Sequence, residues 1–271
     1  MIIDGHAHAC GEYLTLQSIQ NKLNRSNIDM VVLTPGELNS LTTYNLKDVA
    51  IKHPVKDAIS KNNRMMRIFI PLTGVLKNIP NGNEYVYEMK RKMPDKIRQV
   101  YWVTKSNFQK VETDYQKMKF DGIKFHQCWE KFEINDNWFL QTVSWATNEK
   151  IPIFIHLYSH KDVAKLIEFI KKNSQATIII AHLFGLELFL EEDIKYFDNI
   201  FFDLSNCFFV SEQRTMIGIK HFGSTKFIMG SDTPYGIKSL EKTIDQIHRL
   251  PISEYEKKNI LGDNLRGILK F

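Results

Sequence analysis

Histidine, aspartate and lysine side chains recur at the ends of short apolar runs in this sequence of 271 residues. The residues that share this placement are His6, His8, Lys124, His126, His156, His182, Asp203 and Asp232. Residues two apart on a strand point to the same face, so His6 and His8 project together, as do Lys124 and His126. Imidazole and carboxylate groups are the ligands that zinc and similar divalent ions take. The pattern therefore predicts a metal site if the ends of the runs converge.

Each of these residues, taken alone, has a purely structural explanation. A lone histidine at a strand end is more often a hydrogen-bonded core residue than a ligand, and a strand-end aspartate commonly caps the next helix. The joint pattern is more specific, because five of the nine histidines and two aspartates follow apolar runs. We assign His53, His221 and His248 to solvent or packing. His160 follows His156 by four residues, and it could either face a substrate or help to begin a helix.

Eight apolar runs carry these residues, and helical patterns separate most of them. We predict strands at residues 2–8, 30–34, 67–72, 122–126, 151–157, 177–182, 200–204 and 227–232. Eight strand–helix pairs predict an α/β fold that is a single TIM barrel, in which the carboxyl ends of all strands meet at one mouth. An open doubly wound sheet is the alternative, but the glycine-rich phosphate turn after the first strand is missing.

The interval between the third and fourth runs is the longest, at about 55 residues where a strand, a helix and two loops need far fewer. An Asn-, Pro- and Gly-rich stretch at residues 78–83 lies early in this interval, and a Lys- and Glu-rich helical pattern follows it. We therefore predict an inserted loop or lid after the third strand. Ser253 and Glu256 have the spacing of a capping box and predict the start of a helix. No repeat or low-complexity linker divides the chain, so we expect one domain over residues 1–271.

The composition excludes several classes of protein. Hydrophobic residues make up 43% and charged residues 25% of the chain, which is ordinary for a globular protein. The net charge is +5, and the basic residues form no block of five or more, so we expect neither nucleic-acid nor membrane binding. No apolar stretch reaches the roughly 20 residues of a membrane span. Three scattered cysteines and the lack of a signal-peptide pattern predict a reducing, cytoplasmic setting.

The motifs at the run ends resemble those of the amidohydrolase superfamily, specifically its amidohydrolase 2 branch. The resemblance covers essentially the whole chain and rests on IIDGHAH, GIKFH, FIHLY, IIIAHLFG, FFDLSN and MGSDTPYG. The closing ILGDNLRGIL is similar to the usual final helix of the family. Because the HxH pair begins at His6 and only 39 residues follow Asp232, we expect no flanking β-sandwich of the kind that dihydroorotase-like and urease-like relatives carry.

The resemblance implies a role for most of the residues at the mouth. His6, His8, His156 and Asp232 would bind one divalent metal ion, most often zinc. His182 would lie beside the metal-bound water or the substrate as a hydrogen-bond donor or general acid/base, and Asp232 would also accept a proton from the water. Zinc lowers the pKa of bound water to about 7, which makes hydroxide available at neutral pH.

Lys124 is the residue whose role differs among members of the superfamily. Some members carry a carbamylated lysine on the fourth strand that bridges two metal ions, whereas the GIK-type lysine of the amidohydrolase 2 branch is generally unmodified. We favour an unmodified Lys124 that binds an anionic group of the substrate, with His126 and His160 as further substrate contacts. A carbamylated Lys124 would instead add a second metal ion.

Three functions remain as hypotheses. The leading one is a metal-dependent hydrolase that uses metal-activated water on an amide, ester or lactone bond of a small anionic substrate. The second is a metal-dependent non-oxidative decarboxylase of a small aromatic or conjugated acid, in which His182 or Asp232 delivers a proton to carbon. The third, a non-enzymatic binding barrel, is less favoured because every expected ligand is present. The expected partner is a small molecule, and a homo-oligomer is compatible with the exposed helices of such a barrel.

Overall fold

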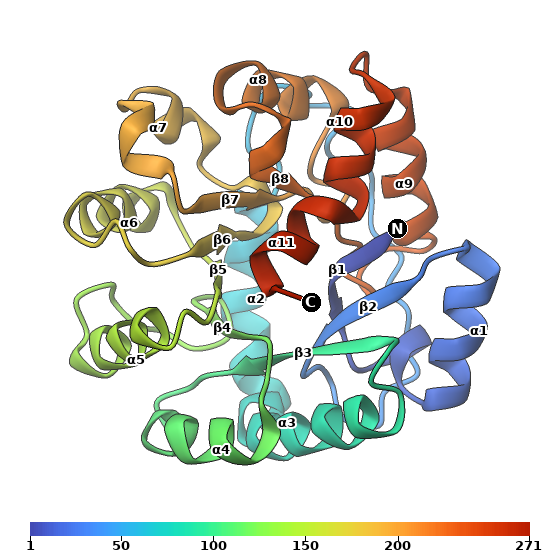
Figure 1. Ribbon diagram of the computed structural model, residues 1–271, viewed down its shortest axis with the longest axis vertical. Helices are drawn as coiled ribbons and strands as arrows, with labels where there is room; N and C mark the ends of the chain where they lie inside the picture. Colours follow the sequence, from blue (N-terminus) through green and yellow to red (C-terminus); the bar gives the residue numbers. More distant parts are fainter.

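Eight parallel strands lie side by side in the order in which they occur along the chain, and each is hydrogen-bonded to the next. The computed structural model describes residues 1–271, except for the side chains of residues 75 and 194. The strands are β1 (Ile3–His8), β2 (Met30–Thr34), β3 (Ile97–Trp102), β4 (Gly122–His126), β5 (Ile153–His156), β6 (Ile178–Ile180), β7 (Ile200–Asp203) and β8 (Phe227–Ile228). Figure 1 shows the strands around a common centre with helices outside them. The predicted TIM barrel is confirmed.

The segment that follows β8 completes the barrel against β1. The backbone N–H of Asp232 donates to the carbonyl of His6 at 2.7 Å, and the N–H of His8 donates to the carbonyl of Thr233 at 2.8 Å. These bonds lie at the carboxyl end of β1, where the HxH pair is. They bring the first and the last of the predicted site residues together, although 226 positions separate them in the sequence.

Helices cover the outside of the strands, and most of them follow a strand directly in the chain. They are α1 (Leu16–Ser26), α2 (Ser60–Thr73), α3 (Val75–Lys92), α4 (Val111–Met118), α5 (Asn137–Asn148), α6 (His160–Lys172), α7 (Leu186–Leu190), α8 (Glu212–Phe222), α9 (Ser239–Arg249), α10 (Glu254–Lys258) and α11 (Asn264–Leu269). The capping box predicted from Ser253 and Glu256 is present and begins α10. None of the helices described is both long enough and apolar enough to cross a membrane.

An apolar cluster fills the interior of the barrel at the end opposite to the histidines. Side chains from six strands, among them Val32, Val100 and Ile179, pack there against Leu265 and Ile268 of α11. In Figure 1, α11 crosses the near end of the barrel, close to the N-terminus of the chain. One end of the barrel is therefore closed by apolar packing, and the polar strand ends gather at the other.

The third predicted strand is wrong. Residues 67–72 lie in α2, and the third strand of the barrel begins thirty residues later, at Ile97. The sequence RIFIPL predicts a buried strand because four of its six residues are large and apolar. In the structure these residues face outward in part, and Ile68 and Leu72 are 65% and 79% exposed. Exposed apolar residues on a helix cannot be distinguished from a buried strand by composition alone.

The true third strand is less apolar than its neighbours, which explains why the pattern did not reveal it. Arg98 and Gln99 interrupt the apolar residues of β3. Gln99 is nevertheless fully buried, and its amide group donates to the carbonyl of Asn83 in α3 at 2.9 Å. A buried polar side chain is tolerated when it is hydrogen-bonded, so tertiary contacts supply what the local pattern lacks.

The predicted insertion exists, but it lies between β2 and β3 rather than after the third strand. It spans residues 35–96 and contains α2 and α3, and the stretch at residues 78–83 that we predicted as a loop belongs to α3. In Figure 1, α2 passes behind the strands, on the side of the barrel away from α11. The insertion therefore lies over the end of the barrel at which the polar residues gather.

Candidate metal centre

His6 and His8 end β1, and a hydrogen bond fixes the proton of each ring. The Nδ1 atom of His6 lies 2.6 Å from Oδ2 of Asp203, and Nδ1 of His8 lies 2.7 Å from the carbonyl oxygen of Pro35. A ring nitrogen that faces an oxygen acceptor carries the proton, so Nε2 of each neutral ring keeps its lone pair. These two Nε2 atoms lie 3.7 and 3.5 Å from Oδ1 of Asp232. The arrangement is a compact set of two imidazoles and one carboxylate.

Asp232 lies four residues past the end of β8, and its backbone has a left-handed conformation with φ of 57°. His182, which follows β6, has the same unusual conformation with φ of 60°. Such backbone is uncommon outside glycine, and it concentrates at functional sites. The pKa of the Asp232 carboxyl lies well below its usual range, because the histidines around it outweigh the burial that would raise it. The carboxylate is therefore ionised at neutral pH.

His156 and His182 face each other through one nitrogen of each ring. The Nδ1 atom of His156 lies 3.1 Å from Nε2 of His182. The remaining nitrogen of each ring donates a hydrogen bond, from His156 to Oδ1 of Asn63 at 2.9 Å and from His182 to the carbonyl of Ser205 at 2.6 Å. The amide nitrogen of Asn63 donates to the carbonyl of Leu157, which leaves its oxygen for His156. In the neutral rings, two bare nitrogens therefore face each other.

This pair tests whether the site fits a cation. Burial lowers the pKa of both His156 and His182, and neighbouring positive groups lower that of His156 further. Both rings are then neutral near pH 7, and two lone pairs 3.1 Å apart have no proton to share. A cation between or beside them would satisfy both. The ligand atoms of His6, His8 and Asp232 lie within 4.8 Å of one another and form a donor set that suits a divalent metal ion, whereas His156 and His182 lie outside that group.

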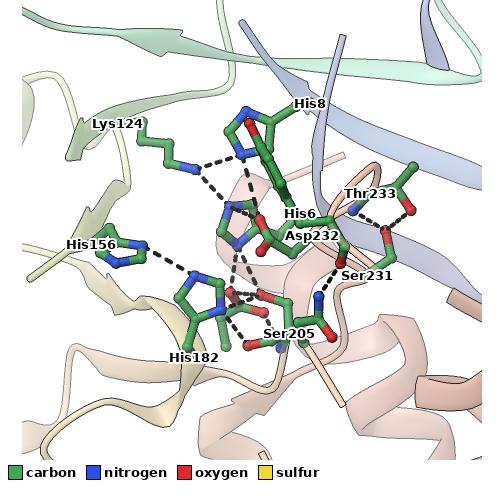
Figure 2. A network of polar contacts seen from close by, with 12 residues as sticks. His6, His8, Lys124, His156, His182, Ser205, Ser231, Asp232 and Thr233 are labelled. Atoms are coloured by element: carbon green, nitrogen blue, oxygen red, sulfur yellow. Dashed lines mark hydrogen bonds and ion pairs between the residues drawn. The ribbon is translucent and has the colours of Figure 1, made fainter. Parts of the chain in front are cut away.

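Lys124 lies beneath this donor set. Its Nζ is 2.6 Å from Nε2 of His6 and 3.5 Å from Nε2 of His8, and Figure 2 shows the side chain reaching toward both rings. Burial lowers the pKa of the amine to about 8. The lysine therefore competes for the lone pairs that would hold a metal ion. His126, at the same end of β4, instead stacks on the ring of His156 with centroids 3.9 Å apart.

A cavity of about 270 Å³ opens above the donor set. One side of it, called here the polar floor, consists of His8, His126, His156, His182 and Asp232. A second group of lining residues, called the apolar wall, consists of Leu46, Ile59, Met65, Met66, Phe69 and Ile70, all from the insertion. Apolar pockets with a few convergent polar groups are the usual form of a small-molecule site. His6 and Lys124 lie behind the floor and are not among the residues that line the cavity.

His160 is the one predicted substrate contact that the structure separates from the other site residues. It is the first residue of α6, its side chain is 50% exposed, and its Nε2 lies 2.6 Å from Oδ2 of Asp57. This bond raises the pKa of the imidazole. Asp57 also pairs with the buried Arg214 at 2.6 Å. The position of His160 matches the alternative expectation, in which it helps to begin a helix.

Sequence reasoning missed several residues that position the site. Asp203 was visible at the end of the seventh run, but nothing in the sequence shows that it orients His6. Ser205 and Pro35 act through backbone carbonyls, which carry no signal in a sequence. Asn63 lies in the insertion, in a segment adjoining the wrongly predicted strand. Cys128 lies near His126 and His156, but burial raises the pKa of its thiol and it has no base partner in the sequence pattern.

Neither a protein-family model nor a curated protein matches the sequence. Solved structures do match the fold. A Staphylococcus aureus protein assigned to the amidohydrolases superposes with a TM-score of 0.67 at 15% identity, over 100% of this chain and 99% of that chain. The 2,6-dihydroxybenzoate decarboxylase of Rhizobium gives a TM-score of 0.70 at 12% identity, with 99% of this chain and 98% of that chain covered.

A third structure was solved with a metal ion. The dihydroxybenzoic acid decarboxylase of Polaromonas sp. JS666, which contains manganese and the inhibitor 2-nitroresorcinol, gives a TM-score of 0.65 at 12% identity. The match covers 99% of this chain and 96% of that chain. At such identities the likeness establishes the fold. These neighbours are consistent with the amidohydrolase resemblance of the motifs.

Proposed function

We propose that this chain is a metal-dependent hydrolase of the amidohydrolase type, formed by one barrel domain over residues 1–271. It would use water to open an amide, ester or lactone bond of a small molecule. The observation that carries the proposal is the convergence of bare imidazole nitrogens and an ionised carboxylate at one end of a barrel. A neighbour described as an amidohydrolase and a neighbour with bound manganese support it.

The residues that would hold the ion are His6 and His8 through Nε2, His156 through Nδ1, and Asp232 through its carboxylate. A bound divalent ion supplies Lewis acidity and makes water a nucleophile at neutral pH. We propose zinc as the ion, one per chain, because two or three imidazoles with a carboxylate suit it. A second ion would require carbamylation of Lys124, whose lowered pKa of about 8 leaves part of the amine unprotonated at neutral pH.

The other side chains around the ion would have separate roles in orienting a ligand and in transferring protons. Asp203 accepts from Nδ1 of His6 and so keeps Nε2 of that ring free and correctly oriented, as carboxylates commonly do behind metal-binding histidines. Asp232 is ionised and can accept a proton. His182 is neutral and donates from Nδ1 to the Ser205 carbonyl, so its Nε2 can take up a proton and return it to a leaving group.

A decarboxylase is the second candidate, because two of the solved neighbours are decarboxylases of dihydroxybenzoic acids. The same residues would serve it: Asp232 or His182 would deliver a proton to the carbon that loses its carboxyl group. Release of carbon dioxide from an aromatic acid distinguishes this reaction from hydrolysis. We also propose a reducing compartment, the cytoplasm, because three cysteines scattered over a long chain do not form the pattern of a disulfide framework.

Metal content measured by elemental analysis, on protein purified without a chelator, tests the proposal first. We expect about one divalent ion per chain, which the double variant His6→Ala/His8→Ala loses. The matched control is His53→Ala/His221→Ala, which removes two exposed histidines and should keep the ion. Protein that holds no ion after supplementation with zinc, manganese or iron would refute the proposal.

A further inference from the structure

Apart from its histidines, the described lining of the cavity contains acidic side chains and no basic ones. Among the described residues that line it, none is a lysine or an arginine, whereas Glu37 and Asp232 are both acidic. The sequence predicts an anionic substrate from the expected placement of Lys124 and His160 at the mouth. In the structure Lys124 lies behind His6 and His8, and His160 lies outside the cavity beside Asp57. The basis for that expectation is therefore removed.

The basic residues of the insertion do not replace them. Lys61 and Arg64 of α2 are exposed and do not line the cavity. The guanidinium of Arg67 lies over the ring of Tyr158, 3.9 Å from its centroid, and Arg67 is likewise absent from the lining. These charges can attract an anion over a distance, but none of them is placed to hold a carboxylate inside the cavity.

The loop after β2 holds Glu37 against the polar floor. The carbonyl of Pro35 accepts from His8, and a side chain at Gly36 would collide with His8, since its Cβ would lie 2.9 Å from the Cβ of His8. Glu37 follows directly, and both of its carboxylate oxygens lie 2.7 Å from the hydroxyl of Tyr44. Close packing on His8 thus fixes a negative charge in the lining.

Tyr44 joins this loop to the segment that follows β8. Its ring stacks on that of Tyr235 with centroids 5.3 Å apart, and its N–H donates to the carbonyl of Pro234 at 3.0 Å. Tyr235 in turn packs edge-on against His8, at 5.4 Å between centroids. Glu37 therefore belongs to a network of hydrogen bonds and packed rings that extends from the loop after β2 to the loop after β8.

The apolar wall continues from the cavity to the molecular surface. Met65 and Phe69 line the cavity, yet they are 49% and 58% exposed. Both belong to α2, whose next outward residue, Leu72, is exposed but does not line the cavity. An apolar group bound against Met65 and Phe69 would remove their exposed area from water, which is favourable at about 25 cal/mol per Å².

We infer that the substrate is an uncharged molecule with an apolar body, which lies against the wall of α2 while its polar reacting group faces the floor, and that Glu37 excludes carboxylates. This inference rests on the proposed function and narrows it to neutral amides, esters or lactones of apolar groups. The cavity of about 270 Å³ corresponds to roughly nine water molecules at about 30 Å³ each. The buried part of the substrate is therefore small, about the size of one substituted ring.

Binding of matched probes to the whole chain tests the charge preference. Benzamide and benzoate have nearly the same size and differ in charge, and their affinities can be measured by calorimetry on protein stripped of metal. The metal-free protein is decisive, because a bound cation would itself attract benzoate. We expect benzamide to bind about tenfold more tightly than benzoate, since like charges placed together in a site oppose binding. Equal affinity, or tighter binding of benzoate, would overturn the inference.

Two variants test whether Glu37 causes the preference for benzamide over benzoate. Glu37→Gln should raise the affinity for benzoate about tenfold and leave benzamide unchanged, since the substitution removes the opposing charge. Asp48→Asn, an exposed acidic residue of the same insertion, is the matched control and should change neither. An unchanged ratio of affinities in Glu37→Gln would remove Glu37 from the proposal.

The wall is tested by the size of the apolar body. Phe69→Ala should lower the affinity for benzamide several-fold relative to acetamide, and Leu72→Ala, on the same helix but outside the cavity, should not. If both variants behave alike, the wall does not bind the substrate.

Turnover of neutral amides, esters and lactones is then measured on the metal-loaded protein. A benzamide preference without any turnover would leave the inference standing and refute the hydrolase. Turnover of carboxylate substrates in preference to neutral ones would support the hydrolase and overturn the inference.

Discussion

The polar floor and the apolar wall line one cavity, but they are built in different ways. Every imidazole of the floor has at least one hydrogen-bond partner and is nearly inaccessible to solvent, as His156 and His182 illustrate. The wall comes from an insertion, and several of its residues are half exposed. Under the proposed function, the strand ends would carry the reacting groups and the insertion would select the substrate, which is the usual division in this fold.

The charges of the molecule follow the same division. Residues 45–77 of the insertion carry seven lysines and arginines against two aspartates. Their net charge of +5 equals that of the whole chain. The rest of the chain is balanced. Basic and exposed apolar residues therefore concentrate on the outer side of the insertion, while the floor depends on a few buried charges with defined partners.

Replacement of Asp232 by Asn should have the largest effect on the floor. The amide can neither accept a proton nor provide an anionic ligand, so we expect turnover to fall by at least about 10²–10⁴-fold, as for loss of a general base. Circular dichroism should show an unchanged fold. Activity within tenfold of the native protein would mean that Asp232 is not part of the reaction.

Asp203→Asn should have the next largest effect, and it acts through His6. The variant loses the carboxylate that orients the ring, and loss of such a partner typically weakens metal binding by about 10–100-fold. Titration with zinc in the presence of a competing chelator measures the change. Asp198→Asn, at an exposed position near the start of β7, is the control and should bind zinc normally.

The stability of the metal-free protein should depend on pH through His8. Burial and the nearby Lys124 lower the pKa of this residue in the folded state to about 4, whereas the ordinary value is 6.5. The unfolded chain takes up the proton first as the pH falls, so stability present above pH 6.5 is lost toward pH 4. From pH 7.5 to pH 5 the loss attributable to His8 is about 2 kcal/mol.

Urea unfolding of the native protein and of His8→Asn, each at both pH values, isolates this contribution. The comparison between the two proteins is needed because Asp4 opposes the trend: burial raises the pKa of its carboxyl to about 6. A buried carboxyl of this kind favours the folded state as the pH falls from 6 toward 3.8. An identical pH dependence in both proteins would show that His8 is not responsible.

Substitution on the outer side of the wall should have the smallest effect. Ile68→Ser changes a residue that is 65% exposed, so we expect the free energy of unfolding to change by less than about 0.5 kcal/mol. Ile179→Ser, at a fully buried position of β6, should cost several times as much. A large loss in Ile68→Ser would show that the outer side of the insertion is covered in solution, and the contrast drawn between the two regions would fail.

Much of the floor could be predicted from the sequence because parallel strands have a strong local signal. Seven of the eight strands follow apolar runs, and the histidines lie at the ends of those runs. The wall could not be predicted in the same way. Its residues lie in the helix that we interpreted as a strand, and exposed apolar side chains carry no periodic signal that separates the two structures.

The sequence by itself determined the type of each group at the mouth, because side-chain chemistry and strand periodicity are local properties. Only the tertiary structure decided which ring nitrogen of each histidine is unprotonated and free to bind a metal ion. That choice depends on partners far away in the chain, such as Asn63 for His156 and Asp203 for His6. The tertiary structure also placed Glu37 in the cavity and left His160 outside it. These placements arise from loop packing between strands, to which many residues contribute weakly and which no short motif encodes.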